Sequence, residues 1–171
     1  RHDIGRGDTV SVMLANTPAM LECHYGVPMC QAVLHAINTR LDAAVIAFQL
    51  DHAEAKIVIG DREVMPVMQE ALKKATVAPL LIQYDDAEYD APKTPISQKA
   101  DVSQKADVAA LDYDDFVAAG DANFAWLMPQ DEWDAISINY TSGTTGNPKG
   151  VVYHHRGADL LAQGNALTTS M

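Results

Sequence analysis

Residues 140–150 read Tyr-Thr-Ser-Gly-Thr-Thr-Gly-Asn-Pro-Lys-Gly, and they directly follow a predicted strand at 135–139. The stretch places hydroxyl side chains, glycines and one cation, Lys149, in a single loop. Glycines tolerate left-handed backbone conformations and let backbone N–H groups approach an anion closely. Hydroxyl groups add hydrogen-bond donors, and the lysine adds a compact positive charge. The composition of this loop therefore predicts binding of a polyphosphate.

The order of residues in the loop does not fit one familiar phosphate-binding motif, G-x-x-x-x-G-K-[ST]. The fifth residue after Gly143 is Pro148 rather than glycine. Lys149 is followed by Gly150 rather than by serine or threonine. A P-loop NTPase is therefore not predicted, and a plain glycine-rich surface turn is the other, less informative interpretation.

The order Thr-Ser-Gly-Thr-Thr-Gly at 141–146, followed by Pro148, Lys149 and Gly150, resembles the phosphate-loop signature of the adenylate-forming superfamily. This superfamily contains acyl-CoA synthetases, luciferases and the adenylation domains of peptide synthetases. The segments that flank the loop, and the Asn-Thr-Arg-Leu sequence at 38–41, resemble the acyl-CoA synthetase branch. The subgroup that they resemble handles short- to medium-chain, sulfur-containing or aromatic carboxylic acids.

Two residues depart from the pattern of that subgroup. Gln31 stands where glycine is usual, and Asp159 stands where an aromatic residue is frequent. Both lie outside the phosphate loop, so they bear on local packing and leave the predicted binding of ATP unchanged.

The resemblance implies a reaction in which a carboxylate attacks the α-phosphate of ATP, pyrophosphate leaves, and coenzyme A captures the acyl-adenylate. It implies ATP, Mg²⁺ and coenzyme A as cofactors or co-substrates. Lys149 is the implied catalytic residue, and Thr141 matches a position that binds Mg²⁺ in some relatives. The residues that the resemblance assigns to the β- and γ-phosphates are Thr141, Ser142, Gly143, Thr144, Thr145, Gly146 and Lys149.

Short apolar runs alternate with amphipathic stretches along the chain. Strands are predicted at 9–14, 32–37, 56–59, 80–83 and 135–139, and helices from 18 to a stop or kink at 26–28, and at 42–50, 62–75, 112–119 and 157–171. Strict alternation of strand and helix is typical of an α/β fold, a parallel sheet with helices on its faces. Ligands in such sheets bind at the carboxyl ends of strands. The resemblance identifies this sheet, with helices on both faces, as part of the large N-terminal domain of an adenylate-forming enzyme.

The chain is predicted to be one partial N-terminal AMP-binding domain, 1–171, truncated at both ends. Residues from about 85 to 130 form an acidic excursion, which contains a tandem repeat of Ser-Gln-Lys-Ala-Asp-Val at 97–108. The chain begins with Arg1 and stops at Met171 within a predicted helix. The segments that hold adenine and ribose in the family, and its C-terminal lysine, are not found. We therefore expect a fragment of an ATP-dependent acyl-CoA synthetase that is inactive alone.

The net charge of −11 argues against a nucleic acid or an anionic membrane as partner, because both require a basic surface. The longest apolar runs, such as 43–48, are far too short to span a bilayer. We expect Cys23 and Cys30 to be buried free thiols, and the adjacent His154 and His155 to be structural or pocket-lining. Cytoplasmic localisation is predicted. The expected partners are the carboxylic acid, ATP, coenzyme A and the rest of the parent chain.

Two other functions remain open from the sequence. An adenylating enzyme that makes no CoA thioester, such as a carrier-protein ligase or an oxidative relative, would share the loop. A non-catalytic nucleotide-binding or interaction fragment would share it as well. The resemblance places the choice of carboxylic acid largely in segments downstream, so the sequence does not predict which acid is used.

Overall fold

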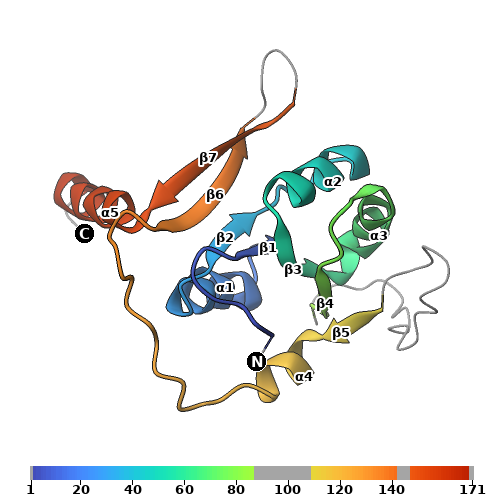
Figure 1. Ribbon diagram of the computed structural model, residues 1–171, viewed down its shortest axis with the longest axis horizontal. Helices are drawn as coiled ribbons and strands as arrows, with labels where there is room; N and C mark the ends of the chain where they lie inside the picture. Colours follow the sequence, from blue (N-terminus) through green and yellow to red (C-terminus); the bar gives the residue numbers. More distant parts are fainter. Residues whose placement is uncertain (1, 87–108, 142–146, 170–171) are drawn as a thin grey trace.

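The computed structural model describes residues 2–86, 109–141 and 147–169. Within these residues, seven strands form one sheet in the order β5-β4-β3-β1-β2-β6-β7 (Figure 1). The strands are β1 (Thr9–Met13), β2 (Val33–Ala36), β3 (Ala55–Asp61), β4 (Leu80–Tyr84), β5 (Ala110–Asp112), β6 (Ala135–Thr141) and β7 (Lys149–His154). Neighbouring strands run parallel except for β6 and β7, which form an antiparallel hairpin. The predicted α/β fold with a parallel sheet is confirmed.

Helices alternate with the first strands along the chain, as the sequence predicts. The described helices are α1 (Pro18–Met29), α2 (Ala43–His52), α3 (Met65–Lys74), α4 (Tyr113–Ala118) and α5 (His155–Thr169), with a short 3-10 helix η1 (Arg62–Val64) before α3. Asp42 caps α2 as predicted, because its Oδ1 accepts hydrogen bonds from the N–H groups of Ala44 and Val45 at 2.9 and 3.0 Å. The sequence predicts a single helix at 62–75, and the structure has two helices in succession there, η1 and α3.

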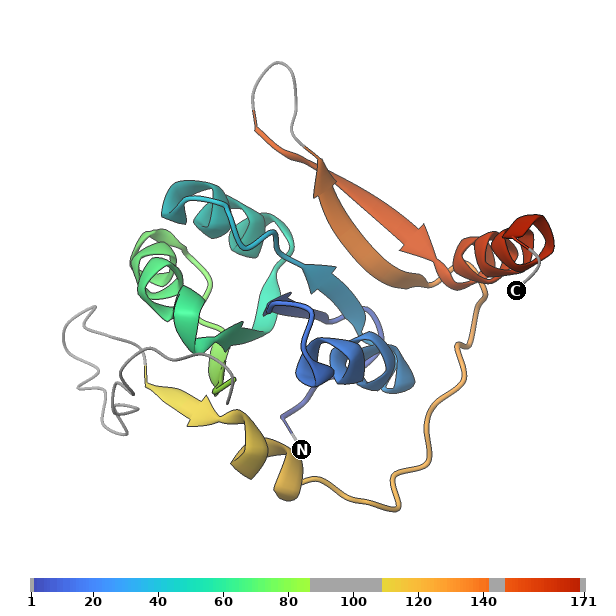
Figure 2. The same ribbon diagram turned by 180° about the vertical axis from the view of Figure 1, so that it is seen from behind.

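The core consists of two apolar clusters, one on each face of the sheet. On one face α2 and α3 cover the sheet, and the buried residues include Met13, Ile46, Leu50, Val58, Met68 and Leu81. On the other face α1 and α4 cover it, and the buried residues include Val10, Val12, Ala19, Cys23, Val27, Ile59 and Tyr113. Figure 2 shows the two layers of helices from behind. The predicted covering of both faces is confirmed.

Helix α1 extends further than the sequence predicts. Ala19, Cys23 and Val27 recur every four residues and are all buried, so one face of the helix stays against the sheet. This burial carries the helix past Gly26 and through Pro28 to Met29. Pro28 has no N–H to donate within the helix, and α1 ends one residue later.

The acidic excursion returns to the sheet before it ends. Residues 110–112 form β5, which the sequence analysis did not predict, and β5 pairs in parallel with β4. Helix α4 follows, close to the predicted 112–119, and the hydroxyl of Tyr113 donates a hydrogen bond to Glu22 of α1 at 2.7 Å. A strand of three residues is too short to show periodicity, which explains why it escaped the sequence analysis. The tandem repeat lies outside the described residues.

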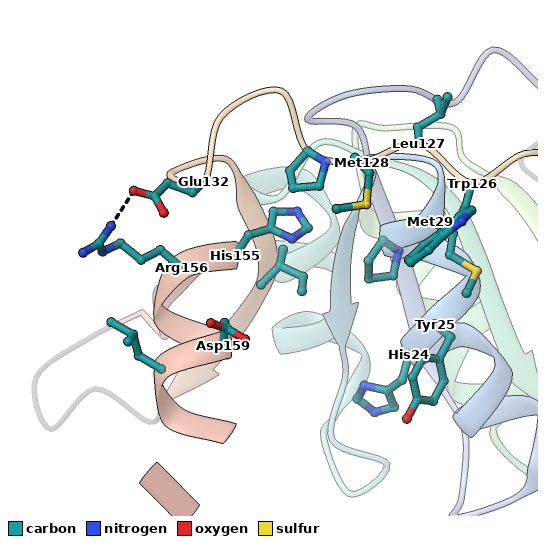
Figure 3. Close-up of a pocket in the computed structure, with 14 residues that line it drawn as sticks. His24, Tyr25, Met29, Trp126, Leu127, Met128, Glu132, His155, Arg156 and Asp159 are labelled. Carbon is teal, nitrogen blue, oxygen red and sulfur yellow. Dashed lines mark hydrogen bonds and ion pairs between the residues drawn. The ribbon is translucent and has the colours of Figure 1, made fainter. Parts of the chain in front are cut away.

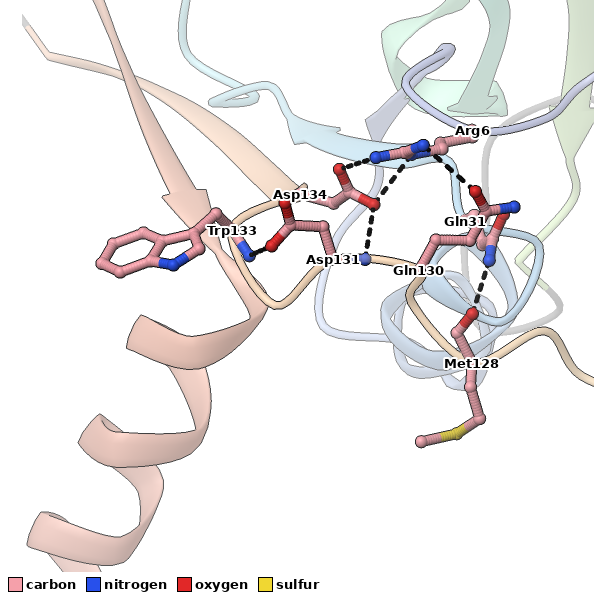
Figure 4. A network of polar contacts seen from close by, with 7 residues as sticks. All are labelled: Arg6, Gln31, Met128, Gln130, Asp131, Trp133 and Asp134. Atoms are coloured by element: carbon pink, nitrogen blue, oxygen red, sulfur yellow. Dashed lines mark hydrogen bonds and ion pairs between the residues drawn. The ribbon is translucent and has the colours of Figure 1, made fainter.

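A polar cluster attaches the segment before β6 to the amino end of the sheet (Figure 4). Arg6 donates two hydrogen bonds to the Asp134 carboxylate, at 2.8 and 2.6 Å, and a third to Gln130. Gln31 has a φ of 63°, a left-handed conformation that glycine adopts most easily. This conformation gives the physical reason why glycine suits position 31, and the Gln31 side chain donates to the backbone oxygen of Met128.

The two cysteines are free thiols, as predicted, but only one of them is buried. Cys23 lies inside α1, and burial raises its pKa to about 11, so the thiol stays protonated at neutral pH. Cys30 is partly exposed, and its Sγ donates to the backbone oxygen of Val27.

In the described part of the chain, no helix is both long and apolar enough to cross a membrane.

Candidate functional site

The predicted phosphate loop lies at the turn of the β6–β7 hairpin. Thr141 is the last residue of β6, Lys149 is the first residue of β7, and the two are direct partners across the hairpin. Residues that stand directly opposite each other in an antiparallel pair point to the same face of the sheet. The hairpin therefore places the Thr141 hydroxyl and the Lys149 ammonium on one side, at the carboxyl end of β6. Ser142, Gly143, Thr144, Thr145 and Gly146 lie outside the described residues.

Both ends of the loop are open to solvent. Thr141 and Lys149 are exposed, and Lys149 makes no ion pair with any residue that the structure describes. A hydroxyl donor and an unpaired cation on one side of a hairpin end can both bind an anionic oxygen. The chemistry at the ends of the loop is therefore compatible with a phosphate ligand.

Strand β7 was not predicted from the sequence. Val151 and Val152 are 40% and 57% exposed, so consecutive apolar residues stand on both faces and give no alternating pattern.

The adjacent His154 and His155 have structural or pocket-lining positions, as expected. The ring of His154 lies 4.6 Å from that of Trp133, and its Nδ1 accepts a hydrogen bond from the N–H of Gly157 at 2.9 Å. His155 begins α5 and lines a cavity.

Tyr140, the residue before Thr141, links the hairpin to helix α2. Its hydroxyl lies 2.7 Å from Nδ1 of His52, the last residue of α2. Its ring centre lies 5.0 Å from that of His35 on β2. Burial raises the pKa of the Tyr140 phenol, so the phenol remains protonated at neutral pH. The sequence analysis assigned no role to Tyr140, His52 or His35.

His35 anchors this contact within the sheet. It is fully buried, and its Nδ1 lies 2.8 Å from the hydroxyl oxygen of Ser11 on the neighbouring strand β1. Burial lowers the pKa of His35 to about 4, and the neighbouring Gln49 side chain opposes the shift. His35 is therefore neutral at physiological pH, and it serves as a packed polar residue beneath Tyr140.

A second group of charged residues lies where β3 ends. Arg62 forms an ion pair with Asp85 at 2.7 Å, and both residues lie just beyond parallel strands. Asp61 is buried, and burial raises the pKa of its carboxyl group. Its Oδ1 accepts a hydrogen bond from the N–H of Glu63. This acidic surrounding suits an anionic phosphate less well than the hairpin end does.

A large cavity, about 650 Å³, opens between α1, the segment before β6 and the start of α5 (Figure 3). Tyr25, Trp126 and His155 line it, and the ion pair of Glu132 with Arg156 lies beside it. Ile136, near the start of β6, also lines the cavity, whereas the phosphate loop follows the end of β6. At about 3.3 Å per residue, the cavity and the loop are separated by most of the length of this strand. The cavity is therefore separate from the predicted phosphate loop.

The residues present set limits on a metal site. Within the described part of the chain, no three His, Cys, Asp or Glu side chains come together in a way that could hold a metal ion. Thr141 offers one neutral oxygen, and Mg²⁺ in nucleotide sites is bound largely by phosphate oxygens and water. The described residues therefore fit Mg²⁺ only as an ion that arrives with the nucleotide.

Known proteins resemble this chain along nearly its whole length. The family of AMP-binding enzymes matches residues 1–169. The peroxisomal acetate/butyrate–CoA ligase of Arabidopsis thaliana is 41% identical over 175 residues, which cover 98% of this chain and 29% of that protein. An acetate–CoA ligase of Humulus lupulus is 42% identical over 168 residues, 94% of this chain and 28% of that protein.

Solved structures share the fold. An anthranilate CoA ligase in complex with anthranoyl-AMP superposes with a TM-score of 0.76 at 20% identity, over 94% of this chain and 27% of that one. A long-chain-fatty-acid–CoA ligase from Archaeoglobus fulgidus gives a TM-score of 0.74 at 20% identity, over 99% of this chain and 29% of that one. The chain thus spans less than a third of the length of each of these proteins. The match over 169 of its residues shows that the chain belongs to the family of AMP-binding enzymes.

Proposed function

We propose that the protein of which this chain forms part is an ATP-dependent acyl-CoA synthetase. A carboxylate oxygen attacks the α-phosphate of ATP, the bond to the β-phosphate breaks, and pyrophosphate leaves. The thiol of coenzyme A then attacks the acyl carbon of the acyl-adenylate, and AMP leaves. Family membership supports this proposal, because relatives at about 40% identity are named as CoA ligases.

The observation that carries the proposal is the pairing of Thr141 with Lys149 at the end of the hairpin. This pairing gives the loop a hydroxyl at one end and a cation at the other, both on one side. We assign Lys149 to the γ-phosphate and to the pyrophosphate that leaves. We assign the residues between them, Ser142, Gly143, Thr144, Thr145 and Gly146, to the β- and γ-phosphates, with backbone N–H groups and hydroxyls as donors.

The proposed role of Lys149 in catalysis is electrostatic. Negative charge accumulates on the departing pyrophosphate, so a cation held in place stabilises the transition state more than the ground state. The net charge of −11 does not prevent ATP binding, because carboxylates beyond a Debye length of roughly 8 Å are largely screened. Mg²⁺ bound to the phosphates, with Thr141 as one ligand, would offset part of the remaining negative charge.

We propose a short-chain or aromatic carboxylic acid as the substrate. Relatives are named for acetate, butyrate and benzoate, and one similar structure contains anthranoyl-AMP.

An adenylating enzyme that transfers the acyl group to a carrier protein is the second candidate, because it would share the phosphate loop. Measuring AMP release with coenzyme A as the acyl acceptor, and separately with a carrier protein as the acceptor, distinguishes the two candidates. We also propose that the 171-residue chain shows no ATP–pyrophosphate exchange alone, since it lacks the family's adenine and ribose segments.

Lys149→Ala in the full-length protein tests the proposal. Loss of one charge-assisted hydrogen bond costs about 1.5–3 kcal/mol. Adenylation should then slow by roughly 10- to 150-fold, at about 1.4 kcal/mol per decade. Thioester formation from supplied acyl-adenylate should remain close to the wild-type rate, because that step contains no pyrophosphate. Single-turnover measurement of both half-reactions, with acetate, butyrate and benzoate, gives the comparison.

The matched control is Lys74→Ala, which removes an exposed lysine at the end of α3. Both half-reactions should keep their wild-type rates in this variant. Lys149→Arg should restore adenylation only in part, because a planar guanidinium does not replace a compact ammonium group. Equal losses in both half-reactions of Lys149→Ala would indicate misfolding, and an unchanged adenylation rate would remove Lys149 from the mechanism.

Cytoplasmic localisation stays a prediction. Several relatives are named as peroxisomal, among them the acetate/butyrate–CoA ligase of Arabidopsis thaliana. Fluorescence microscopy of the full-length protein with a fluorescent tag that leaves its C-terminus free would distinguish the two compartments.

A further inference from the structure

Tyr140 links three elements of the structure. It is in β6, its hydroxyl is 2.7 Å from Nδ1 of His52 at the end of α2, and its ring packs against His35 of β2. The ring centres of Tyr140 and His52 are 5.7 Å apart and nearly perpendicular, an arrangement that aromatic pairs favour. No other residue of the hairpin among those described makes a side-chain hydrogen bond to α2 or β2.

Tyr140 also lies close to β7 within the hairpin. Its direct partner is Gly150, the residue after Lys149. A Cβ at Gly150 would lie 2.9 Å from Cδ1 of Ile138 and 3.4 Å from Cε1 of Tyr140. Glycine at this position therefore lets β7 approach the Tyr140 ring closely, which brings the backbone of Lys149 to a defined place beside it.

We propose that Tyr140 and His52 are positioning residues, which hold Thr141 and Lys149 in the place where they bind the phosphates. This inference rests on the proposed function, because it assumes that Lys149 acts on the phosphates of ATP. Neither Tyr140 nor His52 is a catalytic residue here, since both act through the backbone at the ends of the loop. The hydrogen bond joins the carboxyl end of β6 to α2, and α2 is packed on the core through the fully buried Ile46 and Leu50.

The hydrogen bond matters because few other contacts hold this end of the hairpin. The pairing of β2 with β6 joins Leu34 to Ser137 and His35 to Ile138, and the register ends there. Tyr140 and Thr141 extend beyond these pairs toward the loop. The contact with His52 therefore lies where backbone pairing with the core has stopped, and its loss leaves Thr141 and Lys149 free to shift.

Tyr140→Phe in the full-length protein tests the positioning role, because it removes only the hydroxyl and keeps the ring. Loss of one hydrogen bond corresponds to a decrease of about 3- to 10-fold in kcat/KM for ATP in adenylation. The KM for the carboxylic acid and the rate of thioester formation from supplied acyl-adenylate should not change. Tyr153→Phe on β7, 42% exposed, is the matched control and should leave every constant unchanged.

Variants of His52 separate positioning from a direct contact of Tyr140 with ATP. His52→Leu should reproduce the effect of Tyr140→Phe, and the double variant should be no worse than either single one, because all three lack the same hydrogen bond. His52→Asn should restore part of the activity, since the amide keeps a polar atom near the position of Nδ1. Additive losses, or a wild-type rate in His52→Leu, would overturn the proposal.

Hydrogen exchange in the 171-residue chain supplies a measurement that does not depend on activity. In Tyr140→Phe the amides of Tyr140, Thr141, Lys149 and Gly150 should exchange faster, while those of β1 and β3 keep their wild-type rates. Unchanged exchange at these four amides would refute the positioning role. If Tyr140→Phe speeds exchange at these amides but the full-length protein has no adenylation activity, the proposed function is refuted. The positioning of the hairpin by Tyr140 then still stands.

Discussion

Strands β1, β3 and β4 lie between two layers of helices, whereas β6, β7 and α5 contain no fully buried residue among those described. All five residues of β1 are buried, whereas the residues of β6 are only partly buried and Thr141 at its end is exposed. The candidate phosphate site belongs to the second region, which we call the hairpin region, β6–β7 and α5. The first region, β1 to β4 with α1 to α3, we call the core.

This difference fits the separate tasks of the two regions. A binding site must keep its polar groups accessible to the ligand, so it cannot gain stability by burying them. The core supplies a fixed frame instead, because its helices cover both faces of the sheet. The hairpin region is joined to this frame by short β2–β6 pairing, by Arg6 with Asp134 and by Tyr140 with His52. Precise placement of the site thus depends on a small number of contacts.

The largest expected contrast is in local stability. Amides of β1, β3 and β4 should exchange only through global unfolding, at a free energy of about 5–15 kcal/mol. Amides of β6, β7 and α5 should exchange through local opening that costs several kcal/mol less. Native-state hydrogen exchange of the 171-residue chain, measured residue by residue, provides the comparison. Equal protection in both regions would show that the hairpin region is stabilised as firmly as the core.

A matched pair of leucines tests the same difference by mutation. Leu50 in α2 is 0% exposed and Leu160 in α5 is 55% exposed. Leu50→Ala leaves a cavity and should lower the free energy of unfolding by about 2–5 kcal/mol. Leu160→Ala should change it by less than about 0.5 kcal/mol in this chain. Urea unfolding followed by circular dichroism measures both, and a similar loss in the two variants would contradict the assignment of core and hairpin region.

The buried His35 gives a pH-dependent test of the frame beneath the hairpin. Its folded-state pKa is lowered from 6.5 to about 4, so the unfolded chain binds a proton in this interval before the folded chain does. Its contribution to stability is therefore fully present above pH 6.5 and is lost as the pH falls to about 4, by up to about 3 kcal/mol. Unfolding free energies between pH 4 and 7 should fall on acidification.

A nuclear magnetic resonance titration of the His35 ring supplies the direct check on the same chain. The ring should remain neutral down to about pH 5. His35→Gln should remove this part of the pH dependence while other titrating groups keep theirs. A ring that titrates near 6.5 in the folded chain would show that His35 is open to solvent and does not support Tyr140 as described.

Most of the fold could be predicted because its signals are local. Alternating apolar residues such as Val10 and Val12, the cap at Asp42 and the spacing of strands and helices follow from short stretches of chain. The phosphate loop was predicted in the same way, because its order of hydroxyls, glycines and lysine is a local pattern. Strands β5 and β7 were missed, since one is three residues long and the other is exposed on both faces.

The sequence by itself determined the α/β class, the helices on both faces and the candidate residues at the loop, because each depends on neighbours in the chain. Only the tertiary structure decided what supports the loop. Tyr140 and His52 are 88 residues apart, and Arg6 and Asp134 are 128 apart. Likewise, the left-handed backbone at Gln31 is a consequence of how α1 meets β2. Contacts between distant residues follow from the packing of the whole sheet, which no local pattern contains.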